Sequence, residues 1–120
     1  MERNKPDWKL ENMPCSVCAV ACALNGDLPD DTYTYMKKLH RDGYASLSLA
    51  NSFIRNHLTV QRRRDFKQGE RPKLKDLHCN GRAIVCVLGH YIYLKDEEYW
   101  SFFDNEEDDV VAVWQLKEEK

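Results

Sequence analysis

The chain has 120 residues, a formal net charge of −2 and 42% hydrophobic residues, which is the size and composition of one compact domain. Acidic and basic side chains are scattered along its whole length, so the composition argues against a nucleic-acid-binding or membrane-surface protein. The N-terminus carries no apolar signal segment and no stretch approaches membrane-spanning length, so we expect a cytoplasmic protein. Five cysteines in such a chain favour reduced thiols over a disulfide framework.

Three helices are expected in the first half of the chain. Pro14 opens the first, residues 15–24, whose small and apolar side chains suit a buried helix, and Gly26 supplies its C-cap. Aspartates that can act as N-caps predict a second helix over residues 30–40. An apolar stripe predicts a third, over residues 46–58. The third helix is amphipathic and should lie on a sheet.

The second half of the chain is rich in β-branched and aromatic residues, which favour strands. A short strand should follow Thr59, and a single helical turn should follow a polar loop at residues 65–72. Three further strands are then predicted, at residues 83–94, 99–104 and 110–116. Helices first and an antiparallel sheet second predict an α+β domain.

A hairpin argument brings His90 and Asp104 together. If residues 91–94 and 99–103 pair around Glu97, the imidazole of His90 lies opposite the carboxylate of Asp104. Directly opposed side chains have Cβ atoms roughly 4.5 to 5.5 Å apart, within hydrogen-bonding reach for these two groups. An imidazole that acts as the general base for a nucleophile needs a partner that orients it, and a carboxylate can do this.

Cys15 stands at the start of the first expected helix, where backbone N–H groups and a nearby imidazolium would stabilise a thiolate. Cys18 is the rival nucleophile, one helical turn later. Asn105 is the alternative orienting residue, because a register slip of one residue exchanges the faces of a strand. Cys22 follows on the same stripe and is interpreted as a packing residue.

The order and spacing of several segments resemble the C39-like and Josephin-like domains of the papain-like cysteine peptidase superfamily. The resemblance lies in residues 14–27, 74–77 and 81–87, the Gly89-His90 strand start, and the segment that ends at Asp104. It implies one papain-like domain over residues 1–120, with an α+β minimal core in which an N-terminal nucleophile helix and two further helices pack on a C-terminal antiparallel sheet.

The same resemblance implies a catalytic triad of Cys15, His90 and Asp104. These families usually carry glycine after the nucleophile, where this chain has Ser16, and an upstream glutamine that this chain lacks. Asn12 is the nearest amide that could contribute to an oxyanion hole, together with the backbone N–H of Cys15.

The function expected from these residues is a thiol hydrolase that cleaves a peptide or isopeptide bond in a peptide or protein substrate. A transglutaminase-type acyl-transfer enzyme would use the same three residues. A catalytically inactive papain-like binding or regulatory module is the alternative from another class. No cofactor is expected, and the sequence sets neither the substrate nor the oligomeric state.

A structural zinc protein is the least favoured alternative. Its ligands would be Cys15, Cys18 and Cys22 with His78 or Cys79. Zinc knuckles place a Cys-x-x-Cys pair on a turn and need a second matching pair. The three upstream cysteines lie in a helix-forming run, so the sequence predicts no metal site.

Overall fold

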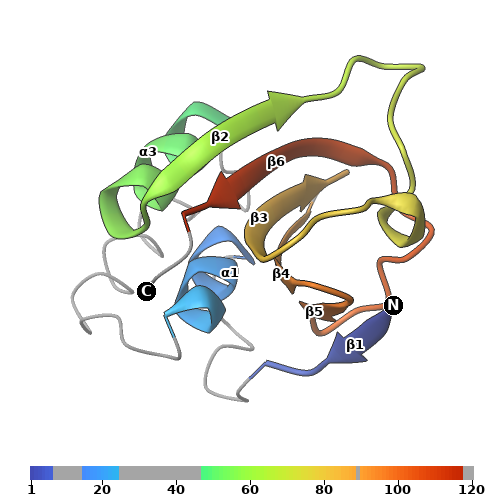
Figure 1. Ribbon diagram of the computed structural model, residues 1–120, viewed down its shortest axis with the longest axis horizontal. Coiled ribbons are helices and arrows are strands. Elements are labelled where there is room, and N and C mark those ends of the chain that lie inside the picture. Colours follow the sequence, from blue (N-terminus) through green and yellow to red (C-terminus); the bar gives the residue numbers. More distant parts are fainter. Residues whose placement is uncertain (7–14, 25–46, 89, 118–120) are drawn as a thin grey trace.

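The computed structural model describes residues 1–6, 15–24, 47–88 and 90–117. Within these residues the chain is an α+β structure in which a six-stranded sheet carries two helices, α1 (Cys15–Ala23) and α3 (Leu47–His57) (Figure 1). The strands are β1 (Glu2–Asn4), β2 (Val60–Asp65), β3 (Arg82–Val87), β4 (His90–Lys95), β5 (Glu98–Trp100) and β6 (Val110–Leu116), with one 3-10 turn, η2 (Leu74–Asp76). The helix expected over residues 30–40 lies outside the described residues.

The strand order across the sheet is β1-β5-β4-β3-β6-β2. Every neighbouring pair is antiparallel except β1 with β5, which is parallel. The N-terminal arm therefore adds an edge strand to the predicted antiparallel sheet. Figure 1 shows α1 beside β3 and β4, and α3 contacts α1.

Apolar side chains cover both faces of the sheet. On one face α1 and α3 pack over a cluster that contains Tyr91 and Tyr93 of β4. On the other face a second cluster contains Ile92 and Leu94, together with Leu74 of η2. Because successive strand residues point to opposite faces, β4 is apolar at every central position. One sheet thus separates two cores.

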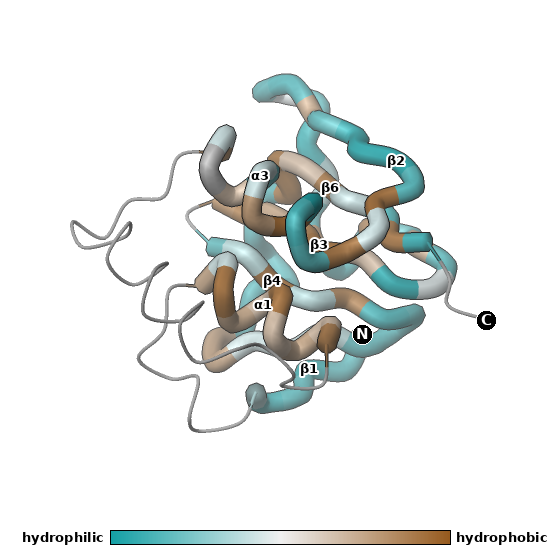
Figure 2. Tube along the Cα trace, turned by 90° about the vertical axis from the view of Figure 1, so that its left-hand side faces the viewer, coloured by the Kyte–Doolittle hydropathy of each residue, from teal (hydrophilic) through white to brown (hydrophobic). Residues whose placement is uncertain are grey.

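Small side chains allow α1 to lie close to the sheet. Every residue from 16 to 21 is buried, and Figure 2 shows the hydrophobic positions of α1 close to those of β4. Arg82 of β3 donates to the carbonyl of Ala23 at 2.6 Å, which satisfies one of the carbonyls left without an intrahelical partner at the C-terminal end of α1. The helix is therefore fixed at this end by the sheet.

The β4–β5 hairpin differs from the predicted one by one residue. Leu94 pairs with Tyr99 rather than with Trp100, and β5 ends at Trp100. Asp96 adopts a φ of 53° and its carboxylate accepts the N–H of Gly81 at 2.9 Å. The observed turn has two residues, Asp96 and Glu97, whereas pairing centred on Glu97 would need a three-residue loop, so each β4 residue pairs one position earlier than expected. The strand pairing that would oppose His90 and Asp104 is consequently absent from the described sheet.

Candidate active site

Cys15 is the first residue of α1, and its thiol lies against the start of β4. The backbone N–H of Tyr91, the residue after His90, donates toward Sγ of Cys15, and the N–H groups of Ser16 and Cys15 itself lie near it. Burial raises the pKa of the Cys15 thiol, and these three donors only partly offset it. The Cys15 side chain is therefore a neutral thiol at rest. Its position at the start of a helix had led us to expect a thiolate.

His90 opens β4 and is half-buried. Its Nε2 lies 3.3 Å from the hydroxyl of Ser101, and the ring of Phe103 meets its ring edge-on at a centroid distance of 5.7 Å. Burial lowers the pKa of His90, while the carboxylate of Asp108 acts in the opposite direction. The imidazole is thus neutral near pH 7.

A chain of hydrogen bonds behind His90 sets its tautomer. Nδ2 of Asn105 donates to the carboxylate of Asp108 at 2.7 Å, so Oδ1 of Asn105 faces Ser101. The Ser101 hydroxyl donates its one proton to that oxygen at 2.5 Å. Ser101 can then only accept from His90, which requires the proton on Nε2. Nδ1, which has no hydrogen-bond partner among the described residues, is left as the basic nitrogen.

The two candidate orienting residues of the sequence occupy different places. Asp104 is exposed, and its carboxylate accepts from the hydroxyl of Tyr99 at 3.4 Å and from the N–H of Glu106 at 3.1 Å. Among the described hydrogen bonds it has none with His90. Asn105 is buried and reaches the imidazole through Ser101. Sequence reasoning missed Ser101 and Asp108, because a loop's side-chain pairing leaves no periodic signal.

Two other predicted residues do not reach this cluster. Asn12 lies outside the described residues. Cys18 is buried in the core under α1, where a hydrogen bond with the Cys22 thiol, followed by burial, raises its pKa. A thiol with these partners is a packing residue, whereas Cys15 is half-buried at the start of α1.

Cys86 and Tyr91 complete the surroundings of the Cys15 thiol. They oppose each other across β3 and β4, and their side chains are hydrogen-bonded. Burial raises the pKa of Cys86 to about 11. Neither residue stood out in the sequence, because both fall inside runs that are apolar for packing reasons.

Exposed apolar side chains border the start of β4. Leu88 and Phe103 are the two exposed large hydrophobic residues of the described chain, at 56% and 64% of their full exposure. Phe103 contacts the His90 ring, and the N–H of Leu88 donates to the carbonyl of Asp109 at 3.1 Å, which joins the β3–β4 turn to the loop after β5. Phe103 thus gives the His90 ring an exposed apolar neighbour.

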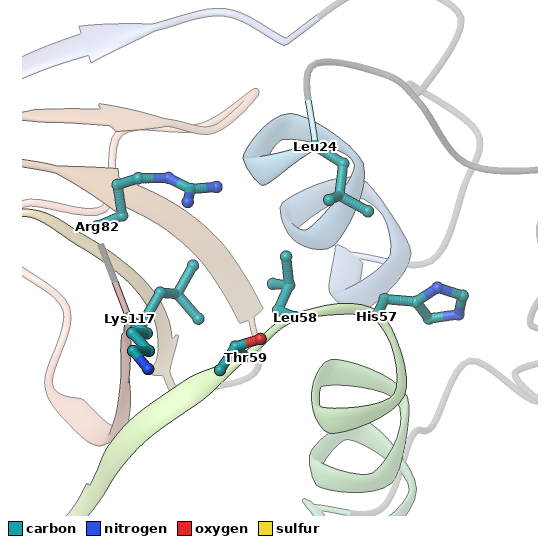
Figure 3. Close-up of a pocket in the computed structure, with 7 residues that line it drawn as sticks. Leu24, His57, Leu58, Thr59, Arg82 and Lys117 are labelled. Carbon is teal, nitrogen blue, oxygen red and sulfur yellow. The ribbon is translucent and has the colours of Figure 1, made fainter. Parts of the chain in front are cut away.

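A hollow in the described part of the chain lies away from Cys15. A cavity of about 150 Å³ is lined by Leu24, His57, Leu58, Thr59, Arg82, Leu116 and Lys117 (Figure 3). It opens past the C-terminal end of α1, whereas Cys15 begins that helix. The candidate chemistry is therefore not in this cavity.

The described residues contain no group of three histidine, cysteine, aspartate or glutamate side chains placed to hold a metal ion. None of their helices combines the length and the apolarity needed to cross a membrane. No family model, curated protein or solved structure matches the chain.

Proposed function

We propose that the chain is a papain-like thiol hydrolase that cleaves a peptide or isopeptide bond, with Cys15 as nucleophile and His90 as general base. One observation carries the proposal: the N-terminus of α1 places the Cys15 thiol on the backbone of Tyr91, directly after a histidine whose Nε2 is fixed by Ser101. The thiol and the imidazole share this end of the sheet, but no contact among the described residues joins them. Cys15 packs with Tyr91 on the α1 face, whereas His90 pairs with Val87, whose side chain belongs to the other core.

The neutral resting state suits general-base catalysis. Because no described contact joins the two side chains, the proposal routes the proton through a water. Nδ1 of His90 takes the thiol proton in this way as Sγ of Cys15 attacks the substrate carbonyl, and the imidazolium then protonates the leaving amine. Water attacks the resulting thioester, and His90 again takes and returns a proton. The N–H groups of Cys15 and Ser16 at the start of α1 are the described donors best placed to stabilise the oxyanion.

In this proposal Ser101 and Asn105 orient the imidazole, and Asp108 supports the imidazolium charge. Asp108 lies close enough to His90 to raise its pKa. The amide of Asn105 joins that carboxylate to Ser101. The arrangement does the work that a directly bonded carboxylate does in a triad.

Turnover of a p-nitrophenyl ester, with mass spectrometry to detect an acyl adduct, tests the proposal. Cys15→Ala should abolish both turnover and adduct, and His90→Ala should lower the rate by about 100-fold or more. Ser101→Ala should cost more than Asp104→Ala, because Ser101 holds the imidazole. Cys79→Ser, a half-buried thiol on the sheet's other face, is the matched control. An adduct that survives in Cys15→Ala would refute the assignment of the nucleophile.

A binding module without turnover is the second candidate. It is favoured by the raised pKa of Cys15 and the lowered pKa of His90, which leave no ion pair at rest. A folded protein that neither turns over the ester nor forms an acyl adduct at Cys15 would support this candidate and contradict the enzyme.

A further inference from the structure

β2 is an edge strand of the described sheet. β2 pairs with β6, and no other strand within the described residues pairs with it. The N–H of Phe66 donates to the carbonyl of Val111 in β6 at 2.9 Å. This bond shows which alternate residues of β2 direct their backbone N–H and C=O groups toward β6. Arg62 and Arg64 therefore bond to β6, while the N–H and C=O groups of Arg63 and Asp65 point away from the sheet.

This edge is strongly basic. Arg62 and Arg64 are exposed, and the guanidinium of Arg64 lies over the ring of Phe66 at 4.6 Å. Arg63 bonds to Asp65 at 2.9 Å and lies over the ring of Trp114 at 5.2 Å. The edge strand thus carries three consecutive arginines, of which only Arg63 is paired with a neighbouring carboxylate, that of Asp65, among the described interactions. Stacking on aromatic rings holds two of them in place.

Charge decides which strand can pair here. A second copy of β2 would bring two arginine triplets together across a spacing of about 5 Å, where like charges repel. An acidic strand would instead place a carboxylate beside each guanidinium while its backbone bonds to Arg63 and Asp65.

We propose that the edge of β2 binds an extended acidic peptide segment of another protein as a seventh strand. Main-chain hydrogen bonds to Arg63 and Asp65 would supply the pairing, and the arginine side chains would select carboxylates. A hollow of about 50 Å³ beside the strand, lined by Arg62, Arg64, Phe66 and Leu77 among others, can accept one small side chain of the incoming strand. Charged residues on an edge strand more often prevent another strand from pairing with it. The test must therefore distinguish binding of an acidic strand from the prevention of pairing.

A fluorescein-labelled peptide of alternating glutamate and valine is the probe, with anisotropy as the readout for the full chain. It should bind, whereas a lysine–valine peptide should not. Arg62→Glu with Arg64→Glu should weaken binding by about tenfold or more. Lys95→Glu, an exposed charge reversal at the end of β4, should leave binding unchanged.

The main-chain contribution is tested with a peptide methylated on alternate backbone nitrogens. Alternate backbone N–H groups of an extended peptide point to opposite edges, so only one set would face β2. Methylating that set should abolish binding, whereas methylating the other set should not, and both peptides keep every charge. Equal binding of both methylated forms would mean attraction of any polyanion and would overturn the proposal. Failure of the acidic peptide to bind, or dimerisation of the chain through β2 in sedimentation, would also overturn it.

Discussion

The side chains at the start of β4 are held neutral by their surroundings. Burial raises the pKa of Cys15 and lowers that of His90, so the thiol keeps its proton and the imidazole releases its second one. Two neutral groups avoid the desolvation cost that two buried charges would carry.

This neutrality makes stability depend on pH at His90. Its folded-state pKa lies below the ordinary value of 6.5, so the unfolded chain binds the proton more tightly. The contribution is fully present above pH 6.5 and is lost as the pH falls through the folded-state pKa. Each tenfold difference in proton affinity is worth about 1.4 kcal/mol. Urea unfolding of the wild type should therefore show a lower free energy at pH 5 than at pH 7.5.

The variant His90→Gln isolates this contribution, because it keeps a polar side chain that does not titrate. The drop in unfolding free energy between the two pH values should be smaller in the variant. An equal drop in both proteins would assign the acid sensitivity to carboxylates and contradict the burial argument for His90.

At the scale of elements, α3 owes its place to one apolar stripe. Ile54 and Ala50 are fully buried, and Asn51 accepts the indole N–H of Trp114 at 2.8 Å. Ile54→Ala should lower the free energy of unfolding by about 2–5 kcal/mol, because it removes buried methyl groups and leaves a cavity. Chemical denaturation measures the change. Ser52→Ala, on the exposed side of the same helix, should change it by less than about 0.5 kcal/mol. Similar losses in both variants would mean that α3 is not held by this stripe.

The elements show what a sequence pattern can and cannot predict. The helix over residues 15–24 and the strand start at His90 were predictable, because a continuous run of small apolar residues and the positions of glycines are local signals. The β4–β5 register was predicted wrongly, since it depends on the positive φ of Asp96, which no periodicity reveals. The link from His90 through Ser101 was also not predictable, because it forms only when the loop after β5 folds back.

At the scale of the whole molecule, the sheet is shared by two cores. Trp114 and Ile84 are fully buried on the face that α1 and α3 cover, and Tyr99 and Leu94 are almost fully buried on the other. Since β3 and β4 contribute to both clusters, neither core can be lost without disturbing the other. Burial on two faces gives a small chain a source of stability that needs no covalent or metal cross-link.

Treatment with a metal chelator should leave the chain folded. Domains that fold around zinc unfold when a chelator takes the ion, because binding free energy is their folding free energy. Here we expect apolar packing to supply the free energy of folding. Cys18 is buried in the core and is hydrogen-bonded to the Cys22 thiol. The melting temperature and the far-ultraviolet circular dichroism should therefore be the same with and without EDTA or 1,10-phenanthroline. A known zinc-finger peptide, unfolded by the same treatment, is the control. Helical signal that disappears with chelator and returns with added zinc would show that the cysteines of α1 hold a metal, and would remove Cys15 from the role of nucleophile.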